Sequence, residues 1–276
     1  MFVLHDSITH LKRGDLGKVV VSGSHGGVYS AQIAALHAVR AAIFHDAGVG
    51  LDCAGIGGLF LLDELGIPAA AVSHMTAEIG NAQHLIENGI ISYANIAATT
   101  IGVKRGQKAQ VAARKLADAA FRPAIKTVSD TPSRQKEKSP TGTTVWLLDS
   151  ASLVKVDDAG SLLITGSHGG IVKSNGSMPI KAKVQLAVFN DAGVGCNAAG
   201  IGRLSSLEAH GIAAVTVCNF TAQIGNARST WETGIISYAN NLAGELHVEP
   251  GQSVQKAIEL ASKNDVSDHS LQEKNL

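Results

Sequence analysis

The 276-residue sequence lacks several features by which broad classes of protein are identified. Its 23 Lys and Arg residues balance its 23 Asp and Glu residues, so no excess charge is present to attract nucleic acid or an anionic membrane. No apolar run approaches the roughly 20 residues that a membrane helix needs. Residues 1–17 lack the basic flank and apolar core of a signal peptide. We therefore expect a cytoplasmic protein with neither nucleic-acid nor membrane partners.

Cysteine and proline are also scarce. The three cysteines are an odd number without CxxC spacing, which argues against a disulfide framework or a zinc knuckle. Thirty glycines against six prolines indicate close backbone approaches rather than disorder. Neither a G-x-G-x-x-G fingerprint nor a phosphate-binding loop with its lysine is present, so no organic cofactor is favoured.

What the sequence does have is an internal repeat. Residues 5–27 align with 148–170, and FHDAGVG at 44–50 returns as FNDAGVG at 189–195. The segments TAEIGNAQHLIENGIISYAN and TAQIGNARSTWETGIISYAN share 14 of 20 residues. The polar residues and glycines repeat best, which indicates a chemical reason beyond a shared scaffold.

Each half predicts alternating strands and helices. Residues 18–23, 41–44 and 67–72 are short apolar runs typical of buried strands. The segments between and after them favour helix, and these are residues 31–40, 55–66, 77–89, 92–102 and 106–120. Residues 4–16 could form a hairpin, but their pattern does not determine whether they do. The fold class is therefore α/β, with two tandem homologous βαβαβα-type, Rossmann-like halves related by pseudo-two-fold symmetry.

The domain boundaries follow from the repeat and from composition. Residues 122–144 carry three prolines and mixed charge without periodicity, which is typical of a linker. The last residues are polar and predict a frayed tail. The resulting division is a first α/β repeat at 1–121, a linker at 122–144, a second α/β repeat at 145–262 and a tail at 263–276. We expect the two halves to pack as a pseudo-symmetric pair, like a fused homodimer, and we also expect the chain to form a homo-oligomer.

Polar residues follow three predicted strands of each half, where open α/β sheets bind ligands. The three strand ends should lie side by side, and we expect a site there between the two halves. Candidate catalytic residues are His25, His45, Asp46, His74, His168 and Asp191. Candidate substrate-binding residues are Ser24, Gly26, Gly27, Thr76, Asn81, Ser167, Gly169, Gly170, Asn190, Asn219, Thr221 and Asn226.

The repeat is chemically uneven at these strand ends. His45 corresponds to Asn190, and His74 corresponds to Asn219. Both residue types form hydrogen bonds, but only His transfers a proton near neutral pH. The exchange indicates that the first half carries acid–base capacity while the second positions by hydrogen bonds. Drift of two structural copies is the alternative.

Each candidate also has a structural explanation. The glycines of GSHGG could hold a substrate carboxylate with their amides or simply form a tight turn. An Asp after a strand could bond the amides of its own loop. Thr76 could cap the following helix, and Asn81 could orient a carboxylate or amide.

A divalent metal is the alternative to cofactor-free chemistry. The set His25, His45 and His74 would suit such an ion, because imidazole is an ordinary ligand of Zn²⁺, Ni²⁺ or Fe²⁺. No local H-x-E-x-H or H-E-x-x-H spacing supports it, so the ligands would come from separate strands.

The sequence thus predicts an enzyme that acts on a small polar, carboxylate-bearing metabolite by His/Asp acid–base chemistry. Hydrolase, lyase or isomerase chemistry would fit, with metal assistance as a variant. The alternative is a non-catalytic binding or sensor protein with two pseudo-equivalent clefts.

Overall fold

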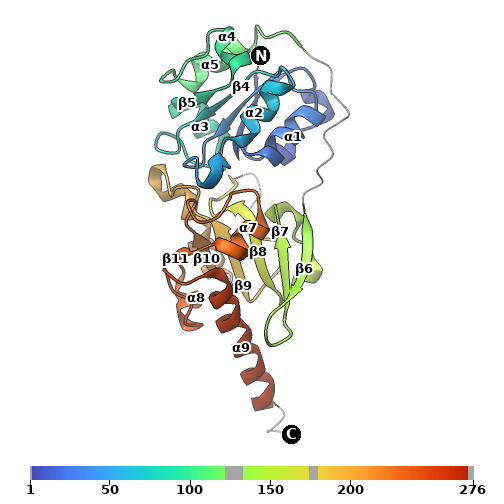
Figure 1. The fold of residues 1–276 in the computed structure, drawn as a ribbon, viewed down its shortest axis with the longest axis vertical. Coiled ribbons are helices and arrows are strands. Elements are labelled where there is room, and N and C mark those ends of the chain that lie inside the picture. Colours follow the sequence, from blue (N-terminus) through green and yellow to red (C-terminus); the bar gives the residue numbers. More distant parts are fainter. Residues whose placement is uncertain (1, 122–132, 174–179, 273–276) are drawn as a thin grey trace. The chain divides into compact units, whose positions relative to one another are not determined.

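The computed structural model describes residues 2–121, 133–173 and 180–272 and has a mixed α/β fold with two sheets, of five and six strands (Figure 1). These residues form two compact units. The first comprises residues 2–121, 170–173 and 192–200, and the second comprises residues 133–169, 180–191 and 201–272. In the part of the chain described, no helix is long and apolar enough to cross a membrane.

The sheet of the first unit has the order β1-β2-β3-β4-β5. Strands β1 to β4 are parallel, and β5 is antiparallel to β4. The strands are β1 Phe2–His5, β2 Val19–His25, β3 Ala41–His45, β4 Ala69–Val72 and β5 Ile91–Ala94. The helices are α1 Val28–Leu36, α2 Gly57–Glu64, α3 Ala82–Asn88, α4 Ile96–Thr100 and α5 Ala109–Leu116, with 3₁₀ turns η1 Ile8–His10, η2 Arg13–Asp15 and η3 Leu51–Cys53.

Alternate residues of the buried strands supply two cores, one on each face of this sheet. Val19 and Val21 of β2 share a cluster with Leu85 of α3. Val20 points to the other face and shares a cluster with Leu62 of α2. A strand buried on both faces favours apolar residues at successive positions, which is why β2 begins as a continuous valine run.

The sheet of the second unit has the order β11-β10-β9-β8-β7-β6. Strands β7 to β10 are parallel, and both edge strands are antiparallel to their neighbours. The strands are β6 Arg134–Lys138, β7 Thr144–Leu148, β8 Leu162–His168, β9 Leu186–Asn190, β10 Ala213–Val217 and β11 Ile236–Ala239. The helices are α6 Arg203–Ala209, α7 Ala227–Thr233, α8 Asn241–Glu245 and α9 Val254–Gln272, with 3₁₀ turns η4 Ala151–Leu153 and η5 Val156–Asp158. The 3₁₀ turn η7 Cys196–Ile201 precedes α6 in the chain, and all but its last residue belong to the first unit.

Two local predictions in the first unit need correction. Residues 92–102, expected to be one helix, contain most of β5 and then the short helix α4, because the Asn95 side chain caps α4 and separates the two. Residues 4–16 do not form a hairpin. Strand β1 pairs in parallel with β2, and 3₁₀ turns lie in the connection between them.

The predicted linker and tail also differ from the structure. Of residues 122–144, those at 122–132 lie outside the described residues, whereas β6 occupies Arg134–Lys138 and pairs with β7. Its polar and charged residues, RQKEK, suit an edge strand, and they leave no apolar periodicity from which the strand could be predicted. Within the predicted tail at 263–276, helix α9 continues to Gln272.

Candidate functional site

The carboxyl ends of β2, β3 and β4 lie side by side, as the sequence predicts. In the strand register His25 pairs with His45, and His45 pairs with Val72. His74 follows β4 after a single intervening residue. The second sheet brings together the ends of β8, β9 and β10, with Asn190 paired to both His168 and Val217.

A left-handed turn leaves the end of β3. Ala47, Gly48, Val49 and Gly50 have φ angles of 49°, 68°, 64° and 71°. Glycine adopts this region without strain, but the Cβ of alanine and especially the branched Cβ of valine do not. The DAGVG sequence of the other half takes the same form, with φ of 50°, 74°, 60° and 71° at residues 192–195. Strain of this kind persists only where the surrounding structure enforces it.

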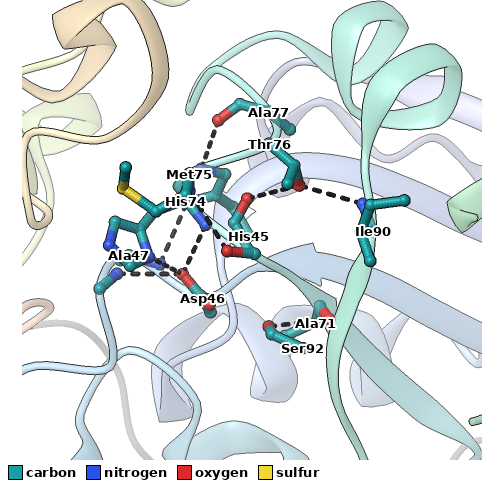
Figure 2. Close-up of polar contacts among 12 residues, drawn as sticks. His45, Asp46, Ala47, Ala71, His74, Met75, Thr76, Ala77, Ile90 and Ser92 are labelled. Carbon is teal, nitrogen blue, oxygen red and sulfur yellow. Dashed lines mark hydrogen bonds and ion pairs between the residues drawn. The ribbon is translucent and has the colours of Figure 1, made fainter. Parts of the chain in front are cut away.

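Asp46, at the start of this turn, is bonded to His74. The Oδ1 atom of Asp46 accepts the His74 Nδ1–H at 2.9 Å and the His74 backbone N–H, also at 2.9 Å. It also accepts the backbone N–H of Gly48 at 3.0 Å. Figure 2 shows Asp46, Ala47 and His74 close together, with dashed lines converging on the Asp46 carboxylate. One oxygen thus joins the β3 turn to the loop after β4.

The protonation states of this pair follow from its surroundings. Burial by itself raises the pKa of Asp46. The His74 hydrogen bonds and the charge that His45 carries when protonated act in the opposite direction, and the net pKa of Asp46 lies below its ordinary value. Asp46 is therefore a carboxylate near neutral pH, and Nδ1 of His74 must be the donor.

The second ring nitrogen of His74 has the chemistry of a base. In the neutral ring with a proton on Nδ1, Nε2 carries a lone pair and no proton. Among the described residues it makes no hydrogen bond, and the His74 side chain is 25% exposed. A buried carboxylate that orients a partly exposed imidazole is an arrangement suited to proton transfer.

His45 has a different environment, because the backbone engages both of its ring nitrogens. Nδ1 accepts the Ala47 N–H at 3.0 Å, and Nε2 donates to the Ala77 carbonyl at 3.0 Å. Burial lowers the pKa of His45 to about 4. The ring is neutral near pH 7 and has no nitrogen left for a substrate, so we remove His45 from the acid–base group.

The second unit explains the exchange of His45 for Asn190. The Nδ2 atom of Asn190 donates to the Ala222 carbonyl at 3.0 Å, the same bond to the matching residue. A similar substitution joins His84 and Ser229. Nδ1 of His84 accepts the Glu78 N–H, and Oγ of Ser229 accepts the Gln223 N–H. At these positions the two side chains make equivalent bonds to the backbone.

His25 is buried at the end of β2 and has one ring nitrogen bound. Its Nδ1 accepts the Gly27 N–H at 3.1 Å, which places the proton of the neutral ring on Nε2. Burial, reinforced by the charge of His45, lowers the pKa of His25 to about 4. His25 therefore offers a neutral N–H donor rather than a base. His168 is equally buried at the end of β8.

Thr76 and Asn81 serve the backbone. The Thr76 hydroxyl donates to the Ser73 carbonyl and accepts the Ile90 N–H, so it does not cap the next helix (Figure 2). Asn81 is the N-cap of α3 and accepts the His84 N–H. Thr221 and Asn226 make the corresponding bonds in the second unit. These contacts account for the four residues without a substrate.

The serines and glycines of the GSHGG segments are also explained by local packing. Ser24 Oγ accepts the Ile8 N–H, and Ser167 Oγ accepts the Ala151 N–H, so each fixes the chain that precedes its strand. A Cβ on Gly26 would lie 2.9 Å from Leu59 Cδ1, and one on Gly27 2.8 Å from the Ala54 carbonyl oxygen. Gly169 bonds to the Asn190 carbonyl and the Arg203 N–H, and Gly170 follows it. A substrate-binding role for these residues stays a prediction.

The second unit retains the carboxylate of the first. Asp191 Oδ1 accepts the Asn219 backbone N–H at 3.0 Å, as Asp46 accepts that of His74. Both residues are buried. Asn219 cannot take up a proton near neutral pH, so the two units differ chemically at this position.

The metal alternative has no support in the geometry. Within the described ranges, no group of three or more His, Cys, Asp or Glu side chains is placed to hold an ion. In addition, the Nε2 and Nδ1 atoms of His45 are both bound to the backbone.

Two pairs of residues outside the main candidate set build the site's framework, and of these the sequence repeat marked Asn95 and Asn240 only as secondary candidates. Asn95 accepts the Ala69 and Ala98 N–H groups and donates to the Leu59 and Ile67 carbonyls. Asn240 makes the same four types of bond in the second unit. Asp6 and Asp149 accept the N–H groups of Ala82 and Ala227, at the starts of α3 and α7. Their identity in both halves was the available signal.

Comparisons of this chain with protein-family models, with curated proteins and with solved structures give no match.

Proposed function

We propose that the protein is an enzyme that acts on a small polar, carboxylate-bearing metabolite by acid–base chemistry, with Asp46 and His74 as the working pair. The observation that carries the proposal is the 2.9 Å bond between His74 Nδ1 and Asp46 Oδ1. It leaves Nε2 of a partly exposed ring as a base while its partner remains ionised and buried. Hydrolysis, elimination and isomerisation all share this proton-transfer step.

In the reaction, His74 Nε2 removes a proton from the substrate or from a bound water and becomes an imidazolium. The Asp46 carboxylate stabilises the resulting charge through the Nδ1 bond. The same Nε2 then returns the proton to the departing or rearranged group, so the enzyme ends in its starting state. His25 donates its Nε2–H to the substrate carboxylate or to a developing oxyanion. Neither step needs a metal ion or an organic cofactor.

We further propose that the chain consists of two tandem homologous, Rossmann-like halves. The support is the sequence repeat together with the pairing β2-β3-β4-β5 and β8-β9-β10-β11, each with three parallel strands and an antiparallel fourth. In this interpretation the second half keeps His168 and Asp191 for binding, and the first half carries out proton transfer.

The proposal is tested by screening the purified protein against a panel of small carboxylate-bearing metabolites and following turnover by mass spectrometry. The variant His74→Gln should lose turnover by about 10²–10⁴-fold, the usual contribution of a positioned acid–base group. His210→Gln is the matched control, because His210 is an exposed histidine of the second unit that bonds only to a nearby carbonyl.

Full turnover by His74→Gln would refute the acid–base role. Binding of a carboxylate ligand with equal affinity by the wild type and His74→Gln, without turnover of any panel member, would instead establish a non-catalytic binding protein.

A further inference from the structure

We propose that His45 is a positioning residue that holds the loop carrying His74, and that it does so as a neutral hydrogen-bonding group for which asparagine is an adequate substitute. This inference rests on the proposed function for its catalytic meaning. Its structural content, the dependence of the His74 ring on His45, can be measured separately.

His45 connects two loops by its two ring nitrogens. The first bond is to the N–H of Ala47, the first residue of the left-handed turn that directly follows Asp46. The second is to the Ala77 carbonyl, three residues after His74. The Asp46–His74 pair lies between these attachments, because Asp46 precedes Ala47 and His74 precedes Ala77 in the chain. His45 thus fixes the spacing of the two segments whose side chains form the pair (Figure 2).

The bond to the loop does not require an imidazole. In the second unit Asn190 makes it through Nδ2 to the Ala222 carbonyl, at the same 3.0 Å. The two side chains are almost completely shielded from solvent, with 2% and 0% exposed. A buried polar group at this position must satisfy the loop carbonyl, and either residue type does so. The chain therefore contains its own example of the substitution that the proposal calls tolerated.

Protonation of His45 would oppose this role. A charged ring would present a second N–H to the Ala47 N–H and break that bond. Burial lowers the pKa of His45 to about 4, in keeping with a ring that works only in its neutral form. Titration by His45 is thus not part of its proposed role.

The test uses the full chain and the ring tautomers of its histidines, measured by long-range ¹H–¹⁵N correlation and assigned with His74→Gln. In the wild type His74 should be in the Nδ1–H form, whereas His25 and His45 should be in the Nε2–H form. The variant His45→Asn should keep His74 in the Nδ1–H form. His45→Leu keeps the bulk but makes no hydrogen bond, and it should give His74 a mixture of tautomers.

The outcomes separate this inference from the proposed function. If wild-type His74 is not in the Nδ1–H form, the catalytic pair itself is wrong. If the wild type shows that form but His45→Asn loses it, or His45→Leu keeps it, the positioning role of His45 is wrong. Where His45→Leu fails to fold, His45→Asn decides alone, because a folded protein with the wild-type His74 tautomer is required.

Turnover provides the second measurement. Once a substrate is found, kcat of His45→Asn should lie within about threefold of the wild type, whereas His45→Leu should lose at least tenfold. Asn190→Leu removes the corresponding bond from the second sheet and shows how much stability that bond contributes, so a general loss of stability can be distinguished from a displaced His74.

Discussion

The Nδ1 atom of His74 lies 2.9 Å from Oδ1 of Asp46, and the backbone N–H of His74 reaches the same oxygen at the same distance. A residue held through both its backbone and its ring has little freedom left to rotate. The energetic cost of orienting the imidazole is therefore met during folding. Asp46 is thus a residue on which folding depends, and under the proposed function the chemistry depends on it as well.

Replacing Asp46 with asparagine should lower the free energy of unfolding by about 1–3 kcal/mol, because charge-assisted bonds to the buried Oδ1 atom are weakened. The Asn amide can also turn its own N–H groups toward the Nδ1–H of His74, and two donors that face each other form no hydrogen bond. Urea denaturation of the full chain measures the change. Asp118→Asn is the control, since Asp118 is exposed, and it should stay within about 0.5 kcal/mol of the wild type. An equal effect of the two changes would contradict the role of Asp46.

Acid should destabilise the protein through His25 and His45. Their pKa values are lowered from 6.5 to about 4 in the folded protein by burial. Below pH 6.5 the unfolded chain binds protons that the folded chain does not, so stability is complete above that pH and falls towards pH 4. Each ring accounts for a loss of up to about 3 kcal/mol. The lowered pKa of Asp46 adds a further loss only at still lower pH, as its own carboxylate is protonated.

The variant His45→Asn isolates one of these contributions. The free energy of unfolding should be measured at successive pH values from 6.5 down to about 4. In the variant it should decrease less steeply with falling pH than in the wild type, and the difference in slope should correspond to the uptake of at most one proton on unfolding. A slope unchanged by this substitution would show that His45 titrates normally in the folded protein.

Gly23→Ala should be strongly destabilising. A Cβ on Gly23 would lie 2.7 Å from the Asn81 backbone nitrogen and 2.7 Å from the Asp6 carbonyl oxygen, and neither backbone atom can move without disturbing the start of α3. We expect a loss of about 3 kcal/mol or more, at the upper end for single substitutions. Gly14→Ala is the matched control, because a Cβ there meets nothing within 4 Å. Thermal denaturation measures the difference, and equal melting temperatures for the two variants would refute the packing argument.

Asn95→Asp should be more damaging than its small change in shape implies. The Asn95 Nδ2 group donates to the Leu59 and Ile67 carbonyls, and a carboxylate would place negative charge against both. The expected loss is about 3 kcal/mol, since a buried charge without a partner is costly. Asn88→Asp, at an exposed residue of α3, controls for charge alone. Near-equal urea midpoints for Asn95→Asp and Asn88→Asp would contradict this account.

Periodicity was sufficient to predict the parallel core of the first unit. The apolar runs at the starts of β2 and β3 and throughout β4 are buried at every position, as expected of central strands, and polar residues follow only towards the carboxyl ends of β2 and β3. The edge strands could not be found in this way. Strand β6 reads RQKEK and has no buried residue, because an edge strand tolerates polar and charged side chains along its length. The sequence predicted one helix where strand β5 and helix α4 follow each other. Asn95 separates the two by capping α4 with its side chain, and a cap leaves no mark on the hydropathy pattern.

The sequence predicted that the strand ends lie side by side, but not the hydrogen bonds that each residue makes there. Strand topology alone brings His25, His45 and Asp46 to one edge of the sheet. Which ring nitrogen is bound depends on backbone groups such as the Ala77 carbonyl, which no residue pattern specifies. The exchange of His45 for Asn190 therefore looked like a change in chemistry and is instead explained by an equivalent hydrogen bond. The exchange of His74 for Asn219 remains the chemically unequal one.

The hydrogen bond shared by His45 and Asn190 has a genetic consequence. A histidine codon becomes an asparagine codon by one nucleotide change. At position 45 that change leaves the loop carbonyl satisfied, whereas at position 74 it removes the only titratable ring that Asp46 holds by its side chain among the described residues. Under the proposed function, the same point mutation is expected to be close to neutral at the end of one strand and inactivating after the next, so natural selection would act against the second change and not the first.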